Sequence, residues 1–339
     1  MRIIRGLEEA PIEPLRGRTI AVIGFGNQGN AHARNLRDSG LEVVVGGREG
    51  SAALSLAEQA GFRSMRVAKA AEAADLVIIA LPDEVQPEVY RREIEPSLRQ
   101  GATIGFLHGF TIRFGLIQPR EDLAVVLVAP KGPGVLLRER FVQRLGLPCL
   151  MAVHQDGAAR SAEAVAVAWA SGIGAARAGI LCTTFAAEAD SDLFGEQVVL
   201  CGGMCELMVA AFETLVAAGF DPLLAYLECC HEMKQIADLI YERGLAGMRE
   251  TISNTAEFGG DRAGPRLIDG SVRSRMKELL AEIQRGDFAK SMREDHARGF
   301  PALAAQRRAQ QAHPIEAAGA AVRALMGKTT AFGPGGAAR

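Results

Sequence analysis

Three glycines that follow the first long apolar run determine which fold class this chain can adopt. The run Thr19–Ile23 leads into six residues with the pattern G-x-G-x-x-G, namely Gly24, Phe25, Gly26, Asn27, Gln28 and Gly29. A helical pattern over residues 30–39 comes next. In that context Gly24 permits a tight turn, Gly26 lets a pyrophosphate approach the backbone, and Gly29 lets the helix pack on the strand. We predict a dinucleotide site at the helix N-terminus, the alternative being a tight turn without a ligand.

Short apolar runs rich in β-branched residues alternate with alanine-rich helical stretches through the first half of the chain. We expect strands at residues 19–23, 42–45, 76–80, 103–106 and 125–129, with 149–153 as a further one. Runs that are apolar throughout are typical of parallel strands buried on both faces. Strands that alternate with helices form βαβ units. We therefore predict an α/β fold with an N-terminal Rossmann-type doubly wound sheet over residues 1–184.

The second half of the chain changes to a helical pattern with few strand-like runs. We expect helices over residues 191–218, 221–244, 270–286 and 301–325. Asp221 and Pro222 are a favourable N-cap and N1 pair for the second of these helices. We predict an all-α C-terminal domain over residues 185–326 and a disordered Gly/Ala/Thr-rich tail over residues 327–339.

The charge balance excludes some classes of partner. Lys plus Arg number 38 against 40 Asp plus Glu, so we expect neither nucleic-acid binding nor a polybasic membrane surface. Aromatic residues make up 5% of the chain, which argues against base stacking on single strands. Residues 1–17 lack the apolar core of a signal peptide, and the longest apolar stretches are broken by Glu or Gly. We therefore expect no signal peptide and no membrane span.

The cysteines bear on the cellular compartment. The chain has six, mostly in apolar surroundings of the second half: Cys149, Cys182, Cys201, Cys205, Cys229 and Cys230. They are too few for a disulfide scaffold in a chain of 339 residues, so we predict reduced, buried thiols and a cytoplasmic protein. Zinc bound by Cys201, Cys205, Cys230 and His231 is a less favoured alternative, because no second ligand pair with zinc-finger spacing follows.

The loop after the second expected strand bears on which dinucleotide binds. An NAD site usually has Asp or Glu there, and that residue grips the ribose 2′-hydroxyl. This chain has Arg48, Glu49 and Ser51. Arg48 together with Ser51 suits a 2′-phosphate, which favours NADPH. Glu49 would repel that phosphate if it pointed inward, and a solvated Arg48–Glu49 pair is the alternative.

Polar residues follow three of the expected strands. His108 follows the fourth strand and Lys131 the fifth, whereas the third is followed by Asp83, Glu84, Val85 and Gln86. Ligands of open α/β sheets bind at this carboxyl edge, although each residue on its own is equally compatible with a structural role. A separate polar stretch at Ser253 reads as a loop or a helix start that contacts a polar ligand.

Two pairs of carboxylates lie four residues apart in the helical half. They are Asp192 with Glu196 and Glu228 with Glu232. This spacing places each pair on one helix face, where like charges destabilise a helix. Carboxylates on mostly apolar stripes are costly to bury unless they bind a metal or a cation. Oxygen ligands favour Mg²⁺ or Mn²⁺ over zinc, and the alternative is that these carboxylates face solvent at helix ends.

Taken together, these motifs resemble ketol-acid reductoisomerase (acetohydroxyacid isomeroreductase) in its short, class I form. The resemblance covers residues 5–326. Seven segments carry it in family order: Val22–Gly29, Leu81–Gln86, His108–Phe110, Val128–Gly134, Asp192–Gln197, Glu228–Glu232 and Ser253–Glu257.

The resemblance implies a metal site and a partner. The helical domain would be knotted, and two Mg²⁺ ions would bind, with Asp192 bridging both, Glu196 completing one site and Glu228 with Glu232 the other. The protein would be a homodimer or a multiple of dimers whose active site is completed across the interface by Glu228 and Glu232 of the other copy. Ser253 would hold the substrate carboxylate.

The resemblance also implies the reaction. An alkyl group of a 2-acetolactate-type substrate migrates to the neighbouring carbonyl carbon, and NADPH, or alternatively NADH, reduces the product to a 2,3-dihydroxy acid such as 2,3-dihydroxyisovalerate, as in valine and isoleucine biosynthesis. His108, Lys131 and Glu232 would move the protons. Cofactor contacts would come from the glycine-rich turn, Arg48, Ser51, residues 83–86 and Gly134. Glu188 would hydrogen-bond a metal-bound water.

A few positions depart from the family pattern. Ala53 stands in place of a second cofactor-loop serine, which weakens the 2′-phosphate site and leaves NADH as an alternative cofactor. Other changes, such as Asn30, Val135 and Cys182, leave room for the same chemistry on a related substrate in a specialised pathway. The competing hypotheses are a metal-free β-hydroxyacid-type dehydrogenase and a nucleotide-binding homologue without catalytic activity.

Overall fold

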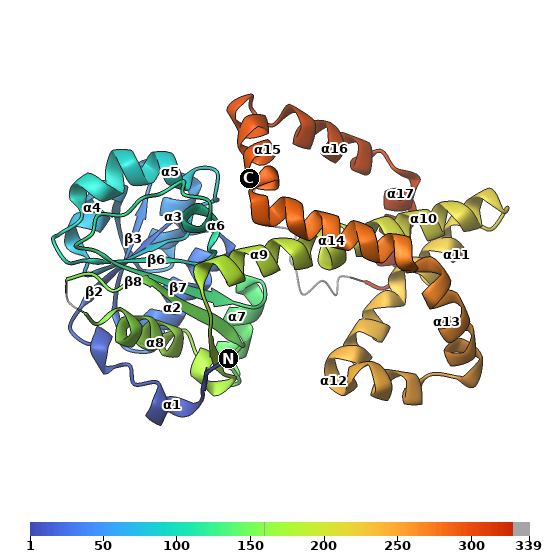
Figure 1. Ribbon diagram of the computed structural model, residues 1–339, viewed down its shortest axis with the longest axis horizontal. Coiled ribbons are helices and arrows are strands. Elements are labelled where there is room, and N and C mark those ends of the chain that lie inside the picture. The colour runs from blue at the N-terminus through green and yellow to red at the C-terminus, as the bar shows by residue number, and fades with distance from the viewer. Residues whose placement is uncertain (159, 328–339) are drawn as a thin grey trace. The chain divides into compact units, whose positions relative to one another are not determined.

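The computed structural model describes residues 1–158 and 160–327, which form two compact units (Figure 1). The first unit comprises Met1–Ala189, and the second begins at Asp190, within helix α9 (Phe185–Gly195). The domain limits drawn from the sequence, 1–184 and 185–326, stay a prediction. The expected disordered tail, apart from Gly327, lies outside the described residues.

A mixed sheet forms the centre of the first unit. Its order among the described residues is β1-β9-β8-β7-β6-β5-β2-β3-β4. The strands are β1 (Ile3–Ile4), β2 (Thr19–Ile23), β3 (Glu42–Gly47), β4 (Arg63–Arg66), β5 (Leu76–Ile79), β6 (Thr103–Phe106), β7 (Ala124–Pro130), β8 (Cys149–Gln155) and β9 (Ile180–Cys182). Strands β2 to β7 run parallel to one another. Strand β8 is antiparallel to β7, and β1 is antiparallel to β9. The predicted doubly wound α/β fold is confirmed, with a mixed rather than purely parallel sheet.

Helices cover both faces of this sheet (Figure 1). They are α1 (Gly6–Glu9), η1 (Glu13–Leu15), α2 (Asn27–Asp38), α3 (Ala52–Gln59), α4 (Val67–Ala73), α5 (Gln86–Val89), η2 (Tyr90–Ile94), η3 (Glu95–Ser97), α6 (Phe110–Arg113), α7 (Gly134–Val142), α8 (Ala162–Gly172) and η4 (Ala175–Arg177). Alternate residues of β2 enter the two resulting cores, Ile20 and Val22 one of them and Ala21 and Ile23 the other. Burial on both faces explains why this strand is apolar throughout.

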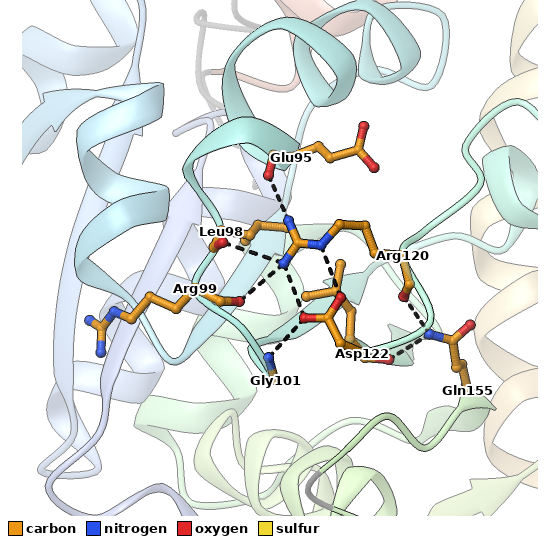
Figure 2. A network of polar contacts seen from close by, with 8 residues as sticks. Glu95, Leu98, Arg99, Gly101, Arg120, Asp122 and Gln155 are labelled. Atoms are coloured by element: carbon orange, nitrogen blue, oxygen red, sulfur yellow. Dashed lines mark hydrogen bonds and ion pairs between the residues drawn. The ribbon is translucent and has the colours of Figure 1, made fainter.

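A polar network joins the amino-terminal ends of β6 and β7 (Figure 2). Arg120 donates to the carbonyl of Glu95 at 2.9 Å and pairs with Asp122 at 2.9 Å. The Arg120 guanidinium, together with the backbone N–H of Gly101 at 3.0 Å, lowers the pKa of Asp122 to about 2. Gln155 donates to the carbonyl of Arg120 at 2.7 Å. Ligands bind open α/β sheets at the opposite edge, so we assign this network a structural role.

The second unit is helical throughout its described residues, as predicted. Its helices are the rest of α9, η5 (Glu196–Leu200), α10 (Gly203–Ala217), α11 (Pro222–Tyr226), η6 (Leu227–His231), α12 (Met233–Thr251), α13 (Asn254–Leu267), α14 (Gly270–Arg285), α15 (Asp287–Ala297), α16 (Pro301–Gln311) and α17 (Pro314–Leu325). The helix expected to end near Gly244 continues to Thr251, with a kink at Gly244, whose φ is 72°. Residues 301–325 form two helices because His313 caps a new one that begins at Pro314.

The core of the second unit is small in the single chain. It consists of Phe212, Ala225, Cys230, Ile315 and Ala318, with partly buried neighbours. Many large apolar side chains lie exposed instead, among them Val199 (54%), Leu200 (59%), Leu207 (49%), Tyr241 (75%) and Phe258 (66%). By length and composition, Phe185–Ala217 is one helix that could cross a membrane. A single copy therefore leaves a large apolar surface uncovered on this unit.

The cysteines only partly match the expected buried thiols. Cys149 and Cys230 are buried, but Cys201 and Cys205 are exposed on the second unit. The error arises because the helix that carries them is apolar on several faces, and Cys201 and Cys205 lie on a part that the described residues of the single chain leave uncovered. No group of three or more His, Cys, Asp or Glu side chains that could hold a metal ion occurs within residues 1–158 and 160–327, so the zinc alternative gains no support.

Candidate active site

The glycine-rich turn joins β2 to α2 in the way the sequence pattern predicts. Gly24 has a φ of +99°, and a Cβ there would lie 2.6 Å from the carbonyl oxygen of Ala80. A Cβ at Gly29 would collide with the carbonyl oxygen of Gly24, whereas one at Gly26 would meet no atom within 4 Å. Gly26 is also the N-cap of α2 and supplies no side chain to its N–H groups. The turn is therefore open where an anion would approach the helix N-terminus.

The other residues of the turn hold the loop that follows β7. Gln28 donates to the carbonyl of Gly132 at 2.9 Å, and the Asn27 side chain accepts from the N–H of Val135 at 3.1 Å. A Cβ at Gly134 would collide with the backbone of Asn27. Phe25 is buried, 4% exposed. Phe25, Asn27, Gln28 and Gly134 thus shape the turn, and their direct contact with a cofactor stays a prediction.

A second arginine, which the sequence pattern did not indicate, reaches the loop after β3 from the neighbouring strand. Arg66, at the end of β4, forms an ion pair with Glu49. The hydroxyl of Ser51 accepts from the N–H of Leu54 at 3.3 Å and so caps α3. Arg48 is exposed. Because β3 and β4 pair in parallel, the register Gly47↔Arg66 brings this second arginine to the loop, which is a long-range effect with no local signal.

His108 and Lys131 follow neighbouring parallel strands, and a buried carboxylate links their two segments. Glu188 of α9 is 1% exposed. It accepts from Lys131 Nζ at 2.8 Å and from the N–H of Gly109 at 2.8 Å. His108 Nδ1 lies 2.8 Å from Asp83 Oδ2. The structure therefore gathers the predicted strand-end residues Asp83, His108 and Lys131 at one edge of the sheet, as expected from the topology.

Glu188 holds two protein groups in the single chain. Its two carboxylate oxygens accept from Lys131 and from the backbone N–H after β6, and the expected contact with a metal-bound water stays a prediction. A Cβ at Gly109 would lie 2.5 Å from the carbonyl oxygen of Phe185 and 3.1 Å from Glu188 Oε2. The close approach of α9 to this loop thus depends on the glycine of the His108–Phe110 motif.

Replacement of Glu188 by Gln is expected to lower the free energy of unfolding. Loss of one partner from a buried ion pair costs about 3–5 kcal/mol, and partial hydration of Lys131 reduces the expected loss to about 1–3 kcal/mol. Urea denaturation would measure this change. The matched control is Glu88→Gln, which breaks an exposed pair with Arg92 and should shift stability by less than about 0.5 kcal/mol. Equal midpoints for the two variants would contradict the assigned role of Glu188.

Both carboxylate pairs lie at π-helical turns of the second unit. Asp192 is on α9 and Glu196 opens the π-turn η5; Glu228 is inside the π-turn η6, which ends just before Glu232. Such turns are rare and occur frequently at functional sites. Asp192 is half-buried, and the other three are exposed.

A glycine pair permits the first of these turns. A Cβ at Gly202 would collide with the carbonyl oxygen of Gln197, and one at Gly203 with that of Val198. Within the described part of a single chain the two carboxylate pairs do not come together into a group that could hold a metal ion. One described chain therefore presents two separate carboxylate pairs, each of which we call a half-site in the proposal below.

Ser253 begins a helix, one of the two readings that its sequence context left open. Its hydroxyl accepts from the N–H of Ala256 at 3.2 Å, which makes Ser253 the N-cap of α13. The residue is exposed and could offer its hydroxyl hydrogen to a ligand while its oxygen caps the helix. Its contact with a substrate stays a prediction.

Known proteins resemble the chain in both of its units. Two family profiles match in succession, "Acetohydroxy acid isomeroreductase, NADPH-binding domain" over residues 14–179 and "Ketol-acid reductoisomerase, C-terminal domain" over residues 185–328. The structure of an NADH-preferring ketol-acid reductoisomerase from an uncultured archean is 44% identical, with a TM-score of 0.93, and the match covers 96% of this chain and 99% of the other. A semialdehyde dehydrogenase NAD-binding protein from Cupriavidus necator is similar in fold alone, at 21% identity and a TM-score of 0.60 over 79% and 98% of the two chains.

Proposed function

The chain belongs to the ketol-acid reductoisomerase family, and from that premise we propose how its residues carry out the reaction. It is an NAD(P)H-dependent reductoisomerase of branched-chain amino acid biosynthesis, so the family and activity expected from the sequence are confirmed. The migration requires the tertiary hydroxyl of a 2-acetolactate-type substrate to lose a proton while the neighbouring ketone is polarised. Hydride transfer then gives a 2,3-dihydroxy acid.

The carboxylate pairs support a proposal of two divalent metal ions. All four side chains are oxygen donors, a set that suits Mg²⁺. Asp192 would help to hold both ions, Glu196 one of them, and Glu228 with Glu232 the other. When bound, Mg²⁺ would supply Lewis acidity that polarises the ketone and favours loss of the hydroxyl proton. The observation that carries this proposal is that two carboxylate pairs, with three of their four side chains exposed and Asp192 half-buried, occur at π-turns in a chain of this family.

Two copies are needed to complete the site in this proposal. The half-sites of one described chain do not meet, and the second unit exposes apolar side chains that a second copy would cover. The apolar helix Phe185–Ala217 lies within the residues that match the C-terminal domain of this metabolic enzyme, so we assign its exposed face to packing against the second copy rather than to lipid. We place this homodimer, or a multiple of it, in the cytoplasm, where its thiols would stay reduced.

The proton movements fall to groups at the sheet edge and on the second unit. Lys131, held by Glu188, is a donor of fixed position, and His108, held by Asp83, can accept and return a proton. Glu232 adds a carboxylate from the helical unit, and Ser253 binds the substrate carboxylate. The test is a steady-state assay with 2-acetolactate, NADPH or NADH, and Mg²⁺. Formation of 2,3-dihydroxyisovalerate is expected, and its absence with both nucleotides would refute the proposed chemistry.

NADPH is the proposed nucleotide, with NADH as the second candidate. Arg48 and Arg66 lie at the loop after β3, the second of them paired with Glu49, and an arginine there favours a 2′-phosphate. NADH is favoured by Glu49, by Ala53, and by the similarity to an enzyme described as NADH-preferring. Because Glu49 and Arg66 form an ion pair, their charges largely offset each other, and the remaining positive charge of exposed Arg48 favours NADPH.

Arg48→Gln is expected to lower kcat/KM for NADPH by about 10- to 100-fold, because a charge-assisted contact with the 2′-phosphate is lost. The value for NADH should stay within about threefold, since NADH lacks that phosphate. Parallel initial-rate measurements with the two nucleotides would show this split, and Arg91→Gln, an exposed arginine on η2, is the control. Equal losses with both nucleotides would remove Arg48 from the 2′-phosphate site. A wild-type preference for NADH above about tenfold would overturn the choice of NADPH.

A further inference from the structure

We propose that Asp83 positions the His108 imidazole for proton transfer, and that its side chain serves this role rather than contact with the nucleotide. Asp83 follows β5 and His108 follows β6, which are paired in parallel with Ile79 opposite Phe106. His108 Nδ1 and Asp83 Oδ2 are 2.8 Å apart, and the two side chains are 19% and 22% exposed. The inference rests on the proposed function insofar as His108 moves a proton of the substrate.

The second carboxylate oxygen of Asp83 is hydrogen-bonded to a buried side chain. This oxygen accepts from Gln86 Nε2 at 3.0 Å, and the same nitrogen donates to the carbonyl of Leu81 at 2.8 Å. The amide oxygen of Gln86 accepts from the hydroxyl of Thr111 at 3.1 Å. Gln86 is 3% exposed and Thr111 is fully buried. Both ends of the Gln86 amide are therefore used inside the protein, so this side chain supports Asp83 and does not extend toward a nucleotide.

The network encloses the segment that carries His108. Thr111 lies on α6, three residues after the histidine, so the hydrogen bonds run from the β5 loop to the β6 loop and back. The ring of Phe110 stacks against the imidazole, with centroids 5.9 Å apart and planes 25° from parallel. A ring face and a carboxylate at Nδ1 together restrict both rotation and tilt of His108.

The contact also selects a tautomer. A carboxylate beside Nδ1 accepts a hydrogen bond, so it favours the form with the proton on Nδ1. Proton exchange with a substrate then takes place through Nε2.

Kinetics of two variants at position 83, with a control elsewhere on the surface, separate positioning from nucleotide contact. Asp83→Asn should lower kcat by about 10- to 100-fold, while the Kd for NADPH without substrate stays within about twofold. Asp83→Glu should keep more of kcat than Asp83→Asn does, because it retains the carboxylate. A purely structural role would favour the isosteric Asn instead. Glu88→Gln, an exposed carboxylate on α5, is the control. A tenfold rise in Kd with kcat preserved would overturn the proposal.

A double-mutant cycle tests whether Asp83 acts through His108. The variant with both Asp83→Asn and His108→Asn should turn over no more slowly than His108→Asn alone, because the positioned group is already absent. Losses that multiply would show that Asp83 acts independently and would refute the proposal.

Nitrogen-15 NMR of the histidine side chains supplies a readout that needs no turnover. In the wild type the His108 ring should carry its proton on Nδ1, and Asp83→Ala should shift the population toward Nε2. A wild-type ring protonated on Nε2 alone would refute the positioning role. This measurement decides the inference even if 2-acetolactate proves not to be a substrate, which would refute the proposed function separately.

Discussion

Asp192→Asn is expected to reduce turnover of 2-acetolactate by roughly 10³-fold or more, since loss of metal-ion stabilisation costs several kcal/mol at the transition state. Asp192 is the carboxylate assigned to both ions, and an amide has neither the charge nor the two equivalent oxygens that such bridging requires. NADPH binding should be unaffected, because the nucleotide turn lies in the first unit and Asp192 in the second. The loss should therefore appear in kcat and in metal affinity.

Two measurements check this outcome. Removal of Mg²⁺ from the wild type with excess chelator should abolish turnover, and added Mg²⁺ should restore it. Binding of Mn²⁺, followed by electron paramagnetic resonance, should weaken in Asp192→Asn but not in Glu206→Gln, a control that removes an exposed carboxylate of α10 outside the proposed site. Full turnover after chelation would refute the metal proposal and favour a metal-free dehydrogenase.

Local patterns predicted the sheet well where a strand is buried on both faces. Thr19–Ile23 and Thr103–Phe106 have the predicted limits, because each is apolar throughout and ends at a change of composition. Strand β4 was missed because Arg63 and Arg66 are polar ends of a four-residue segment at the sheet edge. Its pairing with β3 supplies the stability that its composition does not.

The helical unit shows where capping signals succeed and where they mislead. Asp221 and Asp269 cap α11 and α14 as local chemistry requires, and Gly286 ends α14 in the left-handed region. Gly244, read as a helix end, instead forms a kink between two helical stretches. Ser253 opens α13, a helix that the apolar pattern did not indicate because its described residues are not buried in the single chain.

The sheet-edge residues could be placed from sequence because strand order determines where they meet. Asp83, His108 and Lys131 each follow a parallel strand, so topology alone brings them to one edge. The partners of these residues could not be predicted in the same way. Glu188 lies 57 residues from Lys131, and Arg66 lies 17 residues from Glu49, so both contacts depend on tertiary packing. The carboxylate pairs have the further difficulty that their proposed assembly involves a second chain.

Two inactive variants are expected to recover activity when they are combined in one dimer. Asp192→Asn disables the half-site on α9, and Glu228→Gln disables the one on η6. If each active site takes one half-site from each copy, a mixed dimer has one site with both defects and one site with none. Random pairing makes half of the dimers mixed, so co-expression should restore about one quarter of wild-type turnover.

A second pairing controls for nonspecific rescue. Asp192→Asn combined with Glu196→Gln places both defects in the α9 half-site, so every site in a mixed dimer retains one defect, and no recovery is expected. Different affinity tags on the two variants would isolate the mixed dimers and establish that they form. Recovery in both combinations would show that the half-sites are not divided between copies in this way. Isolated mixed dimers of Asp192→Asn and Glu228→Gln that remain inactive would show that a single chain supplies all four carboxylates. The uncovered apolar surface of the second unit and the separation of the half-sites within one described chain both favour recovery in the first combination alone.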